Sequence, residues 1–115
     1  MENKIIIEGN NLIILPQGIK KLASMKSSLT FPLKHVLGAS IDSGILNESK
    51  GLRSPGTSIP GYWAGSFSKN GEKTFFNIKR SSKPIVIQLK NEAFDRLVLG
   101  SDEPEEIVNL INNRI

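Results

Sequence analysis

The sequence predicts a mainly β domain that ends in one α-helix, arranged as an antiparallel β-barrel or roll of about seven or eight strands. Apolar and polar residues alternate with period two over most of the chain, and glycine, proline and asparagine interrupt the alternation. A strong hairpin signal lies at Asn70-Gly71, and the period changes to that of a helix after residue 101. With 115 residues, the chain fits a single domain spanning residues 1–115.

The first part of the chain predicts four strands and a short helix. The segments "NKIIIE" and "NLIILP" flank Gly9-Asn10, which is a short hairpin loop. "PQGIKKLASM" has apolar residues at helical spacing and predicts a turn or two of helix. Strands follow in "SSLTF", with Leu29 and Phe31 on one face, and in "VLGASID", with Leu37, Ala39 and Ile41 on one face.

The hairpin around Asn70-Gly71 fixes its own register, because both residues tolerate a positive φ. Counting outward from the turn pairs Phe67 with Thr74, Gly65 with Phe76 and Trp63 with Ile78, and this face is apolar. The opposite face pairs Ser66 with Phe75, Ala64 with Asn77 and Tyr62 with Lys79. The apolar pattern and the turn therefore indicate the same register, with the first face directed to the core.

The last part of the chain predicts two strands and the terminal helix. "PIVIQL" and "FDRLVLG" have strand character, and "SDEPEEIVNLINNRI" has helical spacing. Asp102 is the expected N-cap, with Glu105 as its capping-box partner. The helix is expected to dock on the sheet through an apolar stripe made of Ile107, Val108, Ile111 and Ile115.

Composition restricts the environment and the partners. The chain has no cysteine, no apolar run of the roughly 18 residues that span a bilayer, and no signal-peptide pattern at its start. We therefore expect a cytoplasmic protein that is at most peripheral to the membrane. Residues 1–101 hold 14 Lys and Arg against 7 Asp and Glu, whereas residues 102–115 hold 1 against 4. The basic body favours anionic partners, although solubilising surface charge gives the same pattern.

Residues 43–60 form a long irregular stretch rich in Gly, Ser and Pro, and loops of this length are usually functional or mobile. Within it, "GLRSPGTS" has the glycine spacing of a phosphate-binding loop, but Thr57 stands where the lysine belongs. A strand follows instead of a helix, so a nucleotide site is disfavoured. The dipeptides Pro55-Gly56 and Pro60-Gly61 equally suit a connector with two tight turns.

Several cations are expected to converge at the end of the hairpin that lies away from Asn70-Gly71. The loop approaches this end, and so does the turn "KRSSK" at residues 79–83. Such a cluster can bind a phosphate or a carboxylate, although isolated surface cations are often only solvated. The candidate ligand-binding residues are Arg53, Thr57, Tyr62, Lys79, Arg80 and Lys83.

The sequence contains no recognisable catalytic constellation. His35 is the only histidine, Asp42 lies too far along its strand to orient it, and no serine stands in a nucleophile elbow. One histidine and scattered carboxylates do not form a metal cage. We therefore expect no enzymatic activity, no cofactor and no metal.

Several segments resemble bacterial pleckstrin-homology (PH) domain proteins over nearly the whole chain. They are "LTFPLKHVLGASI", "RSPGTSIPGYWAGSF" followed by "NGEKTFFNIK", and "PIVIQLKNEAFDRLVLGSDEPEEIV". The resemblance implies a PH-like fold and a non-catalytic interaction or assembly module, binding a protein partner or itself. The 43–60 loop and the 79–83 turn are the expected contact surface, with Arg53, Arg80 and Lys83 holding an anionic group beside Tyr62.

Two alternatives remain open. Eukaryotic relatives often bind phosphoinositides through basic residues in the first strand–strand loop, but here that loop is "EGNN". A peripheral binder of anionic lipid headgroups is therefore an alternative rather than the main hypothesis. The second alternative is a single-stranded nucleic-acid binder, because Tyr62, Phe75, Lys73 and Lys79 share the outer face of the hairpin. Of these two alternatives, nucleic-acid binding has the weaker support, since no RNA-binding motif is present.

Overall fold

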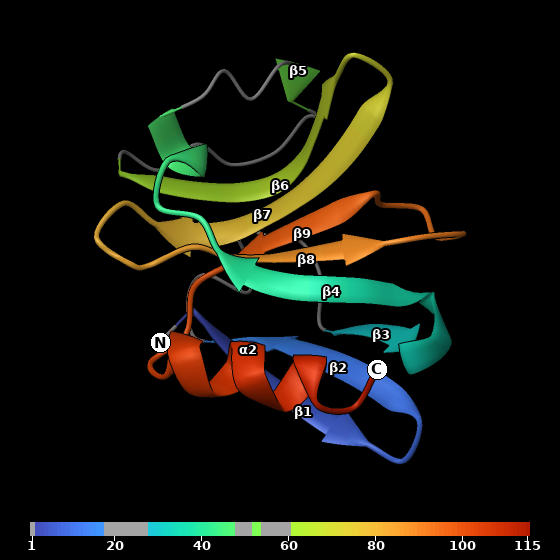
Figure 1. The fold of residues 1–115 in the computed structure, drawn as a ribbon. Coiled ribbons are helices and arrows are strands. Elements are labelled where there is room, and N and C mark those ends of the chain that lie inside the picture. Colours follow the sequence, from blue (N-terminus) through green and yellow to red (C-terminus); the bar gives the residue numbers. More distant parts are fainter. Residues whose placement is uncertain (1, 18–27, 48–51, 54–60) are drawn as a thin grey trace.

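The structure is a computed structural model, and it describes residues 2–17, 28–47, 52–53 and 61–115. The described residues form a mainly β fold with two sheets and one C-terminal α-helix, α2, which spans Pro104–Asn112. Figure 1 shows the larger sheet lying above the smaller one, with α2 in front of the smaller sheet. The mainly β prediction and the terminal helix are confirmed.

The smaller sheet has three antiparallel strands in the order β1-β2-β3. β1 spans Asn3–Glu8, β2 spans Asn11–Pro16 and β3 spans Leu29–Pro32. Glu8 pairs with Asn11, so the predicted two-residue loop at Gly9-Asn10 is confirmed, and Gly9 has a φ of 60°. The helix predicted within residues 16–25 falls largely on 18–27, outside the described residues.

The larger sheet has six strands in the order β4-β8-β9-β7-β6-β5. The hairpin of β6 and β7 has the predicted register throughout, from Lys69 opposite Glu72 to Tyr62 opposite Lys79. Asn70 and Gly71 have φ values of 54° and 81°, as their turn requires. The strand bounds are Val36–Ile41 for β4, Leu52–Arg53 for β5, Tyr62–Lys69 for β6, Glu72–Lys79 for β7, Ile85–Leu89 for β8 and Arg96–Leu99 for β9.

Two features of the sheets differ from the prediction. Nine strands are present among the described residues, and they form two separate sheets rather than a closed barrel. β9 lies between β8 and β7, and it runs parallel to β7, so the sheet is not wholly antiparallel. Alternation in the sequence identifies strands, but it contains no signal for which strands become neighbours.

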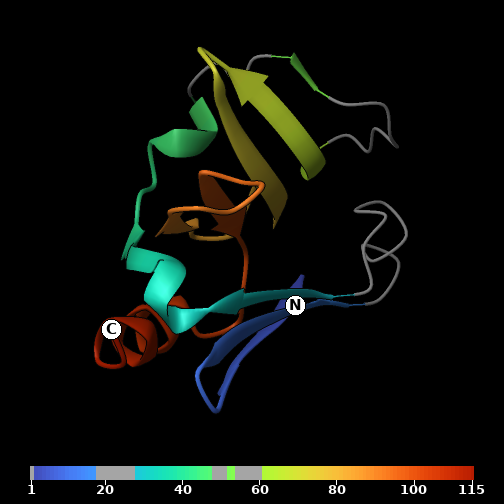
Figure 2. The ribbon, with the colours of Figure 1, turned by 90° about the vertical axis from the view of Figure 1, so that its right-hand side faces the viewer.

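The main core fills the space between the two sheets, and α2 closes one side of it (Figure 2). It takes residues from both sheets and from the helix. A second apolar cluster covers the other face of the larger sheet, around Phe67, Phe76 and Ile78, with Ile45, Leu46 and Trp63 packed against it. Both faces of the central strands are therefore buried. The buried members of the main core are Ile5, Leu12, Ile14, Phe31, Leu33, Val36, Phe75, Ile85, Ile87, Leu89, Leu97, Leu99 and Ile111.

This arrangement corrects the predicted orientation of the hairpin. The face carrying Tyr62, Phe75 and Asn77, expected to be the outer one, is turned toward the main core. Phe75 is 1% exposed and Tyr62 7% exposed. The smaller sheet covers this face, and the hairpin sequence alone gives no indication of that cover.

Strand β4 lies at one edge of the larger sheet, and the prediction for this strand needs one correction. A register shift lies between Val36 and Gly38, so Val36 enters the core and Leu37 is 58% exposed. The prediction that Leu37 shares a face with Ala39 is therefore wrong, because the bulge interrupts the alternation and only Ala39 packs against the core. Farther along, the Asn112 side chain accepts a hydrogen bond from Ala39 N–H at 2.9 Å and donates one to Ala39 O at 2.8 Å. The amide of α2 thus takes the place of a neighbouring strand at this point of the edge.

Helix α2 begins later than predicted. Its N-cap is Glu103, which makes no side-chain capping bond, and Pro104 occupies the first turn. The predicted N-cap, Asp102, lies one residue before the observed one, and the Glu105 carboxylate pairs with Lys83 Nζ at 2.6 Å. Ile107, Val108 and Ile111 pack on the main core as expected, whereas Ile115 lies beyond the helix and is 49% exposed.

Candidate functional site: a pocket at the 79–83 turn

The turn at residues 79–83 connects β7 to β8 and is held by hydrogen bonds on two sides. Ser82 N–H donates to Lys79 O at 3.1 Å, which closes the turn. Arg80 N–H donates to Gly61 O at 2.8 Å, which ties the turn to the start of β6. Because strand pairing fixes both ends, the side chains of this turn project from a defined backbone.

Glu2 anchors the same turn from the side of β1. Its side chain is 2% exposed, and Oε2 accepts hydrogen bonds from Lys79 N–H at 3.1 Å and from the Ser82 hydroxyl at 2.6 Å. A buried carboxylate needs such donors, because an unpaired buried charge is strongly unfavourable. Gly100 makes room for it, since a Cβ at that position would overlap the Glu2 carboxylate. No sequence pattern pointed to this contact, which joins residues nearly 80 positions apart.

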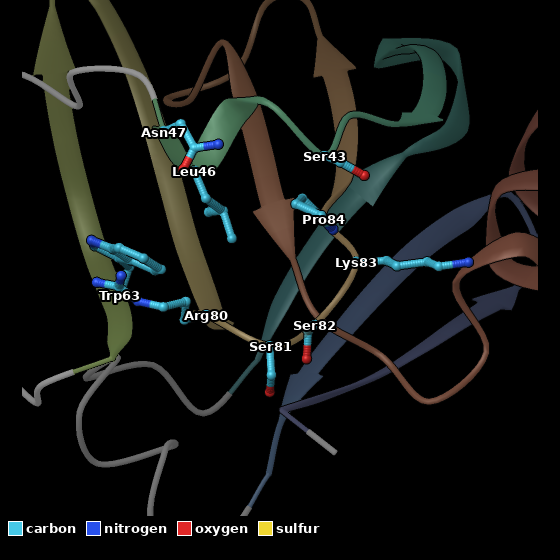
Figure 3. A pocket seen from close by; sticks show the side chains of 9 residues that line it. All are labelled: Ser43, Leu46, Asn47, Trp63, Arg80, Ser81, Ser82, Lys83 and Pro84. Carbon is cyan, nitrogen blue, oxygen red and sulfur yellow. The ribbon is translucent and has the colours of Figure 1, made fainter.

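A pocket of about 310 Å³ opens between this turn and η2, the short 3-10 helix Ile45–Asn47. We call it the Arg80 pocket. The Arg80 guanidinium lies over the Trp63 ring, with its carbon 5.4 Å from the ring centroid. Figure 3 shows Leu46, Trp63, Arg80 and Ser81 arranged around the space. The lining consists of Ser43, Leu46, Asn47, Trp63, Arg80, Ser81, Ser82, Lys83 and Pro84.

The electrostatics of the pocket favour an anion. The described residues that line it include no carboxylate, and Arg80 forms no ion pair with any of the residues that the structure describes. A guanidinium held against an aromatic ring keeps the N–H donors at its edge available for a planar oxyanion. Hydroxyl and amide groups at Ser43, Asn47 and Ser81 add further hydrogen-bonding positions.

The sequence led us to expect Lys79 and Lys83 beside Arg80, but Lys79 does not line this pocket, and Lys83, which does, is paired with a carboxylate outside it. Lys83 Nζ pairs with Glu105 at 2.6 Å, and its side chain points away from Arg80 toward α2 (Figure 3). The hydrogen bond from Lys83 also lowers the pKa of Glu105. Lys79 lines a separate cavity of about 390 Å³, together with Lys83 and the acidic residues Glu2, Asp102 and Glu105.

Of the two remaining predicted residues, which belong to the 43–60 loop, only the backbone of Arg53 is described. The backbone of Arg53 lies in β5 opposite Phe67, five residues along β6 from Tyr62. This separation is about 16 Å at the rise of a strand. The side chain of Arg53 is not among the described parts, and Thr57 lies outside the described residues altogether.

Tyr62 belongs to a buried polar network rather than to the wall of a ligand site. Its hydroxyl donates to Asn77 Oδ1 at 2.5 Å, and Asn77 Nδ2 donates to Asn3 Oδ1 at 2.7 Å and to Glu2 O at 3.2 Å. Asn3 Nδ2 donates in turn to Asn77 O and Gly100 O, each at 2.9 Å. The network fastens β1 to β7, and so joins the two sheets beneath the turn.

Burial, with a smaller contribution from the negative charge of Glu2, raises the pKa of Tyr62 far above its ordinary value. In the unfolded chain the phenol ionises near pH ~10, so above that pH the unfolded state loses a proton that the native state keeps. This contribution to stability is therefore complete below about pH 10 and is lost as the pH rises toward the native pKa.

The pH dependence of unfolding in urea tests this assignment. We expect the stability of the protein to fall above about pH 10, and a Tyr62→Phe variant to lose less stability over that range. At neutral pH the variant should be destabilised by about 1 kcal/mol, because Asn77 loses one donor. Tyr62 is the only tyrosine in the chain, so its ultraviolet absorbance reports the ionisation directly. An equally steep alkaline loss in the variant would show that Tyr62 is not responsible.

Sequence reasoning missed two further groupings. His35 Nδ1 and Glu92 Oε2 lie 2.5 Å apart, although Glu92 lies 57 residues away in the sequence. A cavity of about 620 Å³ lies beside the first hairpin loop and is lined by Asn10, Asn11, Pro32, Leu33, Lys34 and Arg114. We call it the hairpin cavity. Arg114 Nη2 donates to Gly9 O at 2.9 Å, so two cations from distant parts of the chain lie at a loop that has none of its own.

Comparison with known proteins gives no relative: no family model, curated protein or solved structure matches the chain. Within the described residues, no grouping of three or more His, Cys, Asp or Glu side chains suits a metal ion. The same part of the chain contains no helix with the length and apolar character needed to cross a bilayer.

Proposed function

We propose that the protein is a non-catalytic interaction module of the bacterial PH-like type, which binds an anionic group of a partner protein in the Arg80 pocket. One observation carries the proposal: Arg80 lies against Trp63 in a pocket where no carboxylate is found among the described lining residues. The two-sheet architecture with a C-terminal helix supports it, since it suits a scaffold that presents a turn and a short loop helix on one side.

The form of the pocket supports binding over simple solvation of a surface charge. An arginine free in solvent loses much side-chain entropy when it binds a ligand, whereas packing on Trp63 restricts Arg80 beforehand. The turn that carries it is fixed by Gly61 and by the buried Glu2 carboxylate. A preorganised cation of this kind binds an anion more strongly than a mobile lysine at the surface.

An Arg80→Gln variant tests the proposal, with Lys83→Gln as the matched control. Both changes remove one positive charge from the same turn, but only Arg80 lies over Trp63. Trp63 is the only tryptophan, so its fluorescence can follow titration with acidic and phosphorylated peptides. We expect Arg80→Gln to weaken binding by roughly tenfold or more, as expected for loss of a charge-assisted hydrogen bond, and Lys83→Gln to change it less than about threefold.

Calorimetry of the same titrations guards against a change in Trp63 fluorescence that is unrelated to binding. Equal weakening in the two variants would indicate only general attraction to a basic surface and would contradict the proposal. Absence of binding to every anionic probe by the unaltered protein would do the same.

A second candidate function is peripheral binding to anionic lipid headgroups through the hairpin cavity. The observation that favours it is the placement of Lys34 and Arg114 beside the first hairpin loop. It predicts salt-sensitive binding to phosphatidylglycerol vesicles that is lost in a Lys34→Glu, Arg114→Glu double variant and retained in Arg80→Gln. The nucleic-acid alternative loses its main support, because Tyr62 and Phe75 are buried and offer no stacking surface.

A further inference from the structure

The charges around the Arg80 pocket restrict the kind of anion that it suits. Among the described residues that line the pocket, Arg80 is the one cation directed to the space, because Lys83 is engaged by Glu105 and points toward α2 (Figure 3). A phosphate monoester carries a charge of about −1.5 to −2 at neutral pH, so one guanidinium leaves part of it uncompensated. A carboxylate carries a single charge and matches the fork of one guanidinium in two parallel hydrogen bonds.

The apolar part of the lining gives a second, independent restriction. Leu46, Trp63 and Pro84 contribute hydrocarbon surface beside the cation. A phosphate group is hydrated on all its oxygens and gains nothing from such walls. A carboxylate attached to an apolar group gains binding energy from the cation and from the apolar walls, because its charge pairs with Arg80 while its hydrocarbon part is removed from water.

The polar rim indicates what lies next to that carboxylate. The Ser81 side chain makes no hydrogen bond with any described residue, and Ser43 and Asn47 are exposed at the opposite side of the opening. These groups can pair with the amide of a peptide bond that leads into the pocket. A volume of about 310 Å³ holds one or two residues and does not hold a longer folded segment.

From these three observations we infer that the Arg80 pocket binds the carboxylate of an apolar acid, and specifically the C-terminal residue of a partner chain with an apolar side chain. The inference rests on the proposed function and specifies its ligand. Arg80 holds the terminal carboxylate, the apolar side chain packs on Leu46, Trp63 and Pro84, and the rim hydroxyls receive the last peptide unit.

Matched small peptides test the inference by calorimetry and Trp63 fluorescence. N-acetyl-glycyl-leucine should bind, and its C-terminal amide should bind roughly tenfold to a hundredfold more weakly, because the amide lacks the charge that pairs with Arg80. N-acetyl-glycyl-serine, which keeps the carboxylate but not the apolar side chain, should bind several-fold more weakly. The same carboxylate and apolar group could come from the end of a protein chain or from a free acid, and 4-methylpentanoate distinguishes the two. If it binds more weakly than the dipeptide, the ligand is a chain end. If it binds equally well, the ligand is a free acid, and the assignment to a chain end is wrong.

Preference for a phosphate over a carboxylate would be the opposite result, and the same titrations detect it. Phosphate binding in this pocket requires Lys83 to leave Glu105, so a Glu105→Gln variant would then strengthen the binding of a phosphoserine peptide. A phosphoserine peptide that binds more tightly than N-acetyl-glycyl-leucine, and gains from Glu105→Gln, overturns the inference but leaves the proposed anion-binding function standing. Equal affinity for the acid and its amide, in the unaltered protein and in Arg80→Gln, overturns both.

Discussion

An Asn77→Ala variant is expected to lose about 3 kcal/mol or more of unfolding free energy, because three hydrogen bonds end on a side chain with no exposed surface. The change leaves Asn3 Oδ1 and the Tyr62 hydroxyl without their Asn77 partner in the space between the sheets. Each buried polar group that loses its partner costs about 1–3 kcal/mol. Urea or thermal unfolding, followed by circular dichroism, measures the loss.

Asn112→Ala is the matched control for this prediction. Asn112 also makes two side-chain hydrogen bonds, both to Ala39, but it is exposed at the edge of the larger sheet. Water can replace the missing amide there, so the expected loss is about 1 kcal/mol. Similar losses in the two variants would contradict the view that burial of the network, rather than the number of its bonds, holds the two sheets together.

A Gly100→Ala variant should be the second most damaging change, with an expected loss of about 2–4 kcal/mol. The new Cβ would overlap the Glu2 carboxylate, which is buried and cannot move without releasing Lys79 N–H and the Ser82 hydroxyl. Because those bonds hold the 79–83 turn, the variant should also weaken anion binding in the Arg80 pocket.

Gly38→Ala provides the control for Gly100→Ala. A Cβ at Gly38 would meet only Asn112 Oδ1 at 3.9 Å, which is an ordinary contact. We expect little change in either stability or anion binding. If Gly100→Ala were as well tolerated as Gly38→Ala in both measurements, the account of Glu2 as the anchor of the turn would be wrong.

Local rules in the sequence were sufficient for the terminal helix and for most of the strands, but not for η2 and β5, which lie in the stretch expected to be irregular. The asparagine-glycine turn and the two-residue alternation gave the whole register of the β6–β7 hairpin. The switch to helical spacing gave α2 to within a residue or two. These features depend on neighbours within a few positions, and therefore a single sequence contains them.

Relations between distant elements were not predictable in the same way. The position of β9 beside β7, and the cover that the smaller sheet places over Tyr62 and Phe75, depend on packing between segments far apart in the chain. Alternation alone also did not reveal that both faces of the central strands are buried, because Thr74 and Asn77 interrupt the apolar run of β7. The bulge between Val36 and Gly38 likewise interrupted the expected alternation of β4.

The same distinction applies to the candidate site. Arg80 and the 79–83 turn were identified from the sequence because cations in a turn next to a strand end are visible as a local pattern. The partner of each charge was not visible: Lys83 pairs with Glu105, and Arg80 packs on Trp63. Among the residues that the structure describes, one cation packed against an aromatic ring is therefore what this pocket presents.

Nuclear magnetic resonance of the labelled protein, titrated with N-acetyl-glycyl-leucine, tests the central claim most directly. The Arg80 Nε–H and the Trp63 indole N–H should shift together and saturably, because both groups line the pocket that holds the anion. The Nε–H of Arg114, in the hairpin cavity, should remain in place. Saturable shifts at Arg114 with none at Arg80, or no saturable shift at either arginine, would contradict the account.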